Sequence, residues 1–133
     1  MNLRRKKKFL PTSPTDYPAG TFIETEAGYF YIVNSNKRYR IITHRCLASW
    51  RPLRVVQTTE AAVRNYRIAS KLKFRNGSLI WNIANGTIYL IESGKRRAII
   101  SPDALIRIGA VYDDAVPVSV DECALHELGE DLK

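Results

Sequence analysis

Three clusters of basic side chains are the residues in this sequence best suited to bind another molecule. One is the run Arg4–Lys8, and the other two, Lys37–Arg40 and Lys95–Arg97, each follow a short turn signal. Lys and Arg donate charge-assisted hydrogen bonds to phosphates and carboxylates. The net charge of +8 therefore suits an anionic partner without identifying it. The candidate contact residues, for a polyanion or another subunit, are Arg4, Arg5, Lys6, Lys7, Lys8, Lys37, Arg38, Arg40, Lys95, Arg96 and Arg97.

Catalytic chemistry has no comparable support in the sequence. His44 and His126 lie in unrelated contexts and form no metal-ligand spacing. Nucleophile-elbow and phosphate-loop patterns are missing from the sequence, and the acidic pairs Asp113–Asp114 and Asp121–Glu122 are interpreted as solvated helix starts. The sequence therefore predicts a protein that is not an enzyme, with no cofactor and no metal site.

The two cysteines, Cys46 and Cys123, are far apart in the sequence. We expect both to be free, semi-buried thiols, and a single disulfide is the alternative. The basic N-terminal stretch lacks the apolar segment of a signal peptide, and no apolar run reaches the length of a membrane helix. We therefore expect no membrane association and synthesis in a reducing compartment.

The sequence contains two copies of one pattern. "GTFIETEAGYFYIVNSNKRYRIITHRCL" aligns with "GSLIWNIANGTIYLIESGKRRAIISPDAL", with Gly20 on Gly77, Lys37–Arg38 on Lys95–Arg96 and Leu47 on Leu105. Further on, Thr59 aligns with Ser119. The period of about 58–60 residues predicts two stacked supersecondary units. We divide the chain into a basic, extended N-terminal arm (1–19), a first repeat (20–76) and a second repeat (77–133).

Each repeat has the same expected elements. Period-two runs rich in Tyr, Ile and Val predict strands at Thr21–Thr25, Tyr29–Asn34 and Lys37–Ile42, and at Ser78–Asn82, Thr87–Glu92 and Lys95–Ile100. Thr43 and Ser101 are expected helix caps, with Pro102 in the first turn and Gly109 at the end. The predicted fold is α+β, with two tandem repeats that are each a three-stranded antiparallel meander followed by two short helices.

The Lys-Arg pair that follows the turn occurs in both repeats and has three open interpretations. Long basic side chains on an edge strand can cover apolar surface and block edge-to-edge pairing, which would make the pair structural. They can instead contact a polyanion, or they can contact another subunit. The strand register places Arg38 and Arg40 on one face and Lys37 and Tyr39 on the other.

The second repeat resembles a known type of repeat. The segments "GSLI", "IYLIESGKRRAI", "SPDAL" and "VSVDE" are similar to repeats of bacterial surface proteins and of structural proteins in tailed-phage virions. The first repeat departs from this pattern, with "THRC" and "SWRPLR" in place of the corresponding segments. The resemblance implies a small non-enzymatic module, located in the virion and made in the host cytoplasm.

Charge differs sharply between the parts of the chain. Residues 1–19 carry five basic and one acidic residue, residues 20–76 eleven and three, and residues 77–133 five and nine. Complementary repeats of this kind predict head-to-tail contact between copies, or contact with another subunit. The arm adds a possible contact with the phosphate backbone of DNA.

From these observations we expect a non-enzymatic structural subunit of a tailed-phage virion, either a head-tail connector, a tail protein or a capsid accessory protein. Its partners would be other virion subunits in a homo- or hetero-oligomer, recognised through charge-complementary protein–protein contacts. Two alternatives stay open. One is a cell-wall or glycan-binding repeat module, and the other is a nonspecific DNA-binding protein.

Overall fold

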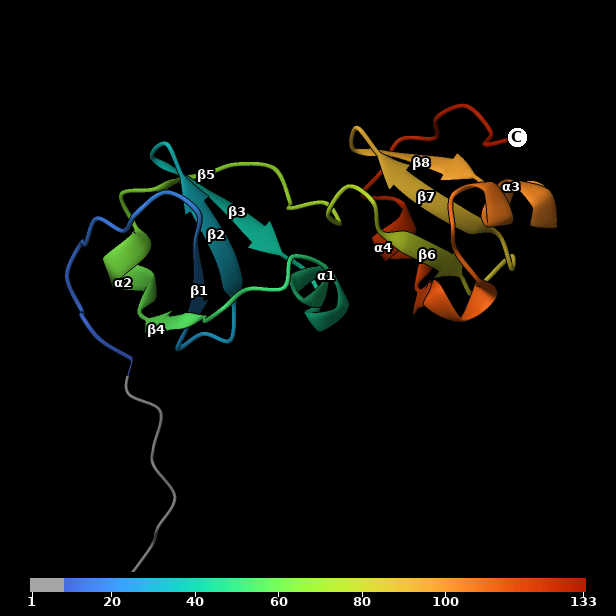
Figure 1. Ribbon diagram of the computed structural model, residues 1–133. Helices are drawn as coiled ribbons and strands as arrows, with labels where there is room; N and C mark the ends of the chain where they lie inside the picture. The colour runs from blue at the N-terminus through green and yellow to red at the C-terminus, as the bar shows by residue number, and fades with distance from the viewer. Residues whose placement is uncertain (1–8) are drawn as a thin grey trace, which may run out of the picture. The chain divides into compact units, whose positions relative to one another are not determined.

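The computed structural model describes residues 9–133, which form two compact units (Figure 1). Unit 1 contains the described residues up to Ile42 together with Pro52–Leu72, and unit 2 contains Thr43–Arg51 together with Lys73–Lys133. The chain therefore passes from one unit to the other three times. The basic run Arg4–Lys8 lies outside the described residues.

Unit 1 is built on a five-stranded mixed sheet with the order β4-β1-β2-β3-β5. The strands β1, β2 and β3 form an antiparallel meander, while β4 pairs parallel to β1 and β5 pairs parallel to β3. One short helix, α2, follows β4. The elements are β1 (Thr21–Thr25), β2 (Phe30–Asn34), β3 (Lys37–Ile41), β4 (Val56–Thr58), α2 (Glu60–Val63) and β5 (Arg67–Ile68).

The tight turn between the second and third strands has the same design in both units. Ser35 and Asn36 have φ values of 51° and 63°, and Ser93 and Gly94 have values of 52° and 75°. Two successive residues with positive φ form the hairpin turn whose twist matches that of the flanking strands. Asn and Gly tolerate this conformation, which is why the turn signals predicted these hairpins correctly.

The core of unit 1 lies between the sheet and α2. It contains Ile23, Tyr31, Val33, Val63 and Tyr66, all less than a tenth exposed.

The stretch from residue 11 to residue 17 packs against this core. The Thr59 hydroxyl donates to the carbonyl of Pro11 at 2.7 Å, and the Thr15 N–H donates to the carbonyl of Ala62 at 2.9 Å. Tyr17 packs against the core, and its N–H donates to the Tyr66 hydroxyl oxygen at 2.8 Å. This part of the predicted arm is therefore a component of unit 1.

Unit 2 is built on a four-stranded mixed sheet with the order β8-β7-β6-β9, in which β9 pairs parallel to β6. Pro117 is tolerated in β9 because this strand lies at the edge of the sheet. Parallel bridges from Arg96 to Leu128 and from Ile99 to Leu132 stand where unit 1 has β5. The elements are α1 (His44–Ser49), β6 (Leu79–Asn82), β7 (Ile88–Glu92), β8 (Lys95–Ala98), α3 (Pro102–Arg107), the 3-10 helix η1 (Tyr112–Asp114), β9 (Val116–Val118) and α4 (Val120–Cys123).

The prediction of two repeats that each consist of an antiparallel meander and two helices is wrong, although the fold is α+β and the six meander strands are present. Each meander is extended by a parallel strand, β4 or β9, and unit 1 gains β5 as well. The helix α1 also belongs to unit 2 and not to the meander that precedes it. These three features depend on partners distant in the sequence, which the local pattern does not specify.

Candidate functional site

The basic pair after the turn separates into one partly buried and one exposed residue. In unit 1, the Arg38 side chain is only 12% exposed and its guanidinium lies 5.2 Å from the centre of the Tyr31 ring. Its Nη1 atom is 3.8 Å from Oε1 of Glu60, which accepts a hydrogen bond from the Tyr31 hydroxyl at 2.9 Å. Burial, with the neighbouring Glu60, raises the pKa of Tyr31 to about 12. Arg38 therefore joins β3 to α2 and has a structural role.

Arg96 has the corresponding position in unit 2. Its guanidinium lies 5.5 Å from the centre of the Tyr89 ring. Its Nη1 atom donates to the carbonyl of Cys123 at 3.3 Å and also to the carbonyl of His126. These carbonyls lie at and just after the end of α4, where a cation is favourable. Both arginines of the repeated pair are thus part of the scaffold.

Five of the six exposed basic residues in the described part of unit 1 lie on β3, on the segment that pairs with it, or in the turn before that segment. Lys37 and Arg67 are register partners on neighbouring parallel strands. The pairing continues beyond β5, because the Leu72 N–H donates to the carbonyl of Arg40 at 2.8 Å. The basic edge of unit 1, as we name it, consists of the exposed residues Lys37, Arg40, Arg64, Arg67 and Lys71, with Lys37 and Arg67 on one face of the sheet, Arg40 on the other face, and Arg64 in the turn before β5. Within residues 9–133, none of these five side chains is in an ion pair.

Arg40 is held in place by an aromatic ring. Its guanidinium carbon lies 4.3 Å from the centre of the Tyr29 ring, a distance at which the ring face attracts the cation. Tyr29 is itself 39% exposed and meets Tyr31 edge-to-face, with ring centres 6.3 Å apart. The stack leaves the guanidinium of Arg40 oriented and accessible.

The corresponding edge of unit 2 has nearly balanced charge. Glu127 takes the place of Arg67, one residue before the bridge from Arg96 to Leu128. Arg97 forms an ion pair with Glu92 at 3.3 Å and donates from Nε to the carbonyl of Glu130 at 3.1 Å. The five positions that match the basic edge are Lys95, Ala98, Ala124, Glu127 and Asp131. Five cations in unit 1 thus correspond to one cation and two carboxylates in unit 2.

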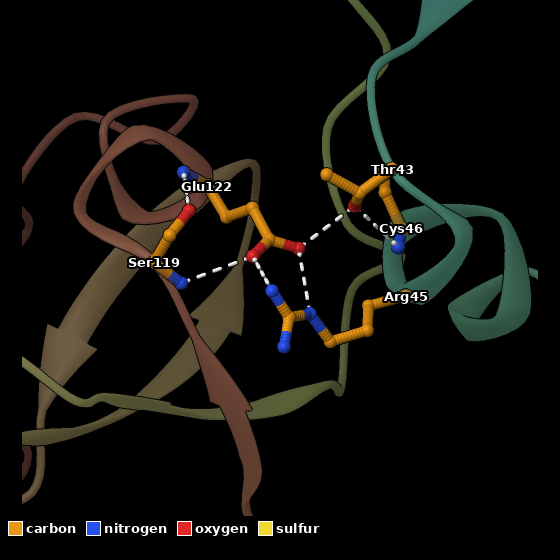
Figure 2. Close-up of polar contacts among 5 residues, drawn as sticks. All are labelled: Thr43, Arg45, Cys46, Ser119 and Glu122. Atoms are coloured by element: carbon orange, nitrogen blue, oxygen red, sulfur yellow. Dashed lines mark hydrogen bonds and ion pairs between the residues drawn. The ribbon is translucent and has the colours of Figure 1, made fainter.

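A buried carboxylate holds α1 in unit 2, as Figure 2 shows. Glu122 of α4 has no exposed surface, and it accepts hydrogen bonds from the Thr43 hydroxyl and from Nη2 of Arg45, both at 2.7 Å. The backbone N–H of Ser119 donates to the same carboxylate at 3.0 Å, and the N–H of Glu122 donates back to the Ser119 hydroxyl oxygen. Burial raises the pKa of Glu122, but these hydrogen bonds outweigh burial and hold the pKa below its ordinary value.

The prediction that Asp121–Glu122 is a solvated helix start is wrong for Glu122. The signal that could have identified its role is the spacing Ser-x-x-Glu, which is typical of a capping box at a helix N-terminus. That pattern identifies the Ser119 contact. It cannot identify Thr43 and Arg45, which are more than 70 residues away in the sequence.

The division into units also changes the charge of the second half of the molecule. Residues 77–133 alone have an excess of four carboxylates. Unit 2 includes Arg45, Arg51, Lys73 and Arg75 as well, so it contains nine basic and nine acidic residues and is neutral. The described part of unit 1 contains seven basic and four acidic residues. Net charge therefore does not make the two units complementary, and any complementary contact depends on local surfaces.

His126 is buried in unit 2 and has two hydrogen-bond partners. Its Nδ1 atom is 2.7 Å from the carbonyl oxygen of Gly94, and its Nε2 atom accepts the N–H of Phe74 at 3.1 Å. The first contact requires a proton on Nδ1 and the second requires a lone pair on Nε2, so the ring is neutral. Burial, reinforced by the charges of Lys73 and Arg96, lowers the pKa of His126. His126 is therefore a core residue of unit 2.

The cysteines also lie in unit 2, where both are buried thiols that form no disulfide. Burial raises the pKa of Cys46 to about 12 and also raises that of Cys123. A thiol that stays protonated is a poor nucleophile, so neither residue is suited to covalent catalysis.

Unit 2 also contains a cleft of about 740 Å³ beside α1. Its floor comes from β6 and β7, and its walls come from α1 and from residues between Ile108 and Val116. Leu79, Leu90 and Ile108 contribute apolar surface, while Arg45 and Asp114 contribute charge. The size suits a small molecule. No described group in the cleft has the arrangement of a nucleophile and a base.

No protein-family model, curated protein or solved structure matches this chain. Within residues 9–133, no helix has the length and apolar character needed to cross a membrane.

Proposed function

We propose that the chain is a non-enzymatic structural subunit that works through contacts with another protein subunit. The observation that carries the proposal is the surface of unit 2 from Ile100 to Tyr112. This segment contains five large apolar side chains that are 37% to 69% exposed. They are Ile100, Ile106, Ile108, Val111 and Tyr112. Isolated exposed apolar residues are common, whereas a concentration of them is typical of a surface that another molecule covers.

Acidic residues accompany this apolar surface. Asp103 lies in the first turn of α3, and Asp113 and Asp114 lie in η1; all three are exposed. Apolar contacts supply most of the stability of a protein interface, and charges around them select and orient the partner. An acidic rim therefore favours a neighbouring subunit with a basic surface.

The resemblance of the second repeat to repeats of tailed-phage structural proteins supports a virion as the setting. In that setting the chain would be a head-tail connector, a tail protein or a capsid accessory protein.

The test is the light-scattering mass of the full chain at low and at high salt. We expect a defined oligomer at low salt and a lower mass at high salt, because salt screens the charged rim. Replacing two side chains of the apolar surface, Ile106→Asp with Tyr112→Asp, should give a monomer at both salt concentrations.

The control is Leu53→Asp, which introduces one aspartate at a fully exposed apolar residue of unit 1. This variant should keep the mass of the wild-type protein. A wild-type monomer at both salt concentrations would contradict self-assembly.

A further inference from the structure

We propose that the basic edge of unit 1 binds the phosphodiester backbone of a nucleic acid. The inference does not depend on the proposed subunit contact, which involves a different unit. It selects five residues from the many basic residues of the chain, and three of them (Arg64, Arg67 and Lys71) lie outside the clusters that the sequence indicates. It also excludes Arg38 and Arg96, whose guanidinium groups bind within their own units.

The first argument is the pair of like charges at the centre of the edge. Lys37 and Arg67 are direct register partners on parallel strands. Like charges in such positions destabilise a sheet, and no carboxylate among residues 9–133 forms an ion pair with either of them. A bound anion would remove this repulsion, because one phosphate can accept hydrogen bonds from both side chains.

The second argument is the length of the edge. The segment from Arg67 to Leu72 runs beside β3, since the N–H of Ala69 donates to the carbonyl of Arg38 and that of Leu72 to the carbonyl of Arg40. On β3 the pairing extends from Lys37 to Arg40, three residues or roughly 10 Å at the rise of a strand. Along each strand, a duplex has one phosphate for about every 3.4 Å of its axis. The edge is thus long enough to contact several consecutive phosphates.

The third argument is the oriented guanidinium of Arg40, which adds a cation on the other face of the same edge. Its stack on Tyr29 at 4.3 Å reduces the freedom that the side chain would lose on binding. Tyr29 is 39% exposed beside it, so an unpaired base can also contact the ring.

A purely protective role explains the edge less well. Lysine on an edge strand discourages pairing with other chains. Unit 2 has that protection with Lys95 alone and places Glu127 where unit 1 has Arg67. Protection therefore does not require a second cation at the register position, nor the additional cations Arg64 and Lys71.

The experiment compares two full-chain variants that have the same net charge. The edge variant is Lys37→Gln with Arg67→Gln, and the matched control is Lys95→Gln with Arg97→Gln on the corresponding edge of unit 2. Binding to a labelled DNA duplex, a DNA single strand and an RNA single strand is measured by fluorescence anisotropy over a range of salt concentrations. The three ligands distinguish between sources of the same phosphodiester chemistry.

The edge variant should bind more weakly, by on the order of 50-fold near 0.1 M salt, if both side chains contact phosphates. The slope of log affinity against log salt should fall by about 2 for the duplex and by somewhat less for the single strands. The control should keep the slope of the wild-type chain. The same difference should persist in a chain whose residues Arg4–Lys8 are all replaced by Gln.

Three results would overturn the proposal. The edge variant and the control could lose affinity equally, which would assign binding to net charge. The difference could vanish when Arg4–Lys8 are replaced, which would assign binding to that run. Lastly, polyglutamate could bind the wild-type chain more tightly than any nucleic acid and lose affinity only in the edge variant. That result would assign the edge to an acidic protein.

Discussion

Units 1 and 2 share the order of four strands and a partly buried arginine on the third strand, but they differ in three corresponding features. Unit 1 has Ala62 where unit 2 has the buried Glu122. Tyr66 of unit 1 accepts the N–H of Tyr17, while His126 of unit 2 accepts the N–H of Phe74. The outer edge is basic in unit 1 and nearly balanced in unit 2. The shared features define the common fold, and the positions that differ determine how the two units differ in stability and in surface charge.

Ala62 and Glu122 differ in the hydrogen-bond partners that their side chains need. Ala62 needs no partner for its side chain, and its carbonyl accepts the N–H of Thr15. The Glu122 carboxylate stays charged inside unit 2 because Thr43, Arg45 and Ser119 donate hydrogen bonds to it. The buried carboxylate therefore makes the stability of unit 2 depend on α1.

The largest expected effect comes from removing that carboxylate. Glu122→Ala leaves the Thr43 hydroxyl, the Arg45 guanidinium and the Ser119 N–H without their acceptor, and it should lower the free energy of unfolding of unit 2 by about 3 kcal/mol. Both tryptophans, Trp50 and Trp81, belong to unit 2. Urea unfolding followed by tryptophan fluorescence therefore reports this unit.

Asp121→Ala is the control for this prediction, because it removes an exposed carboxylate from the same helix. It should change the free energy of unfolding by less than about 0.5 kcal/mol. Equal losses in the two variants would contradict the role that we assign to Glu122.

The sequence predicts those structural features of the two units that depend on local chemistry. The six meander strands follow from alternating apolar residues and from turns that tolerate positive φ. The start of α3 follows from Ser101, whose hydroxyl accepts the N–H of Ala104, and from Pro102 behind it.

Features that depend on distant partners could not be predicted. β4 and β9 have only three residues each and pair parallel to strands more than 30 residues away. The burial of Glu122 depends on α1, and the like-charge contact on the basic edge depends on β5. Among the predicted site residues, only Lys37 and Arg40 of unit 1 form part of that edge.

A smaller effect concerns the stability of unit 2, which should decrease in acid. Burial lowers the pKa of His126 in the folded chain, so the unfolded chain binds more protons once the pH falls below about 6.5. The stability of unit 2 should therefore decrease as the pH falls below that value. Protonation of Nε2 would also break the hydrogen bond from Phe74. A second decrease should begin near pH 4.5, because the folded-state pKa of Glu122 is also lowered.

Urea midpoints from tryptophan fluorescence between neutral pH and about pH 4 would measure both steps. His126→Tyr places in unit 2 the residue that unit 1 has at this position, a side chain that gains no charge in acid. This variant should lose the first step and keep the second. A first step of unchanged size in His126→Tyr would assign the acid response to another group.

The smallest expected effect concerns the cost of the basic edge to unit 1. Arg67→Glu places a carboxylate opposite Lys37, as Glu127 stands beside Lys95 in unit 2, and should stabilise the pairing of β3 with β5 by about 0.5 kcal/mol. The amide protons of Ala69 and Leu72, which donate across this pairing, should then exchange with solvent about two-fold more slowly at low salt. High salt should remove the difference, since the effect comes from exposed charges.

The reciprocal variant Glu127→Arg should speed exchange of the amide of Gly129, which donates to the carbonyl of Arg96. Faster exchange in Arg67→Glu would mean that Lys37 and Arg67 do not repel each other in the free protein, and the first argument for an anion at this edge would fail.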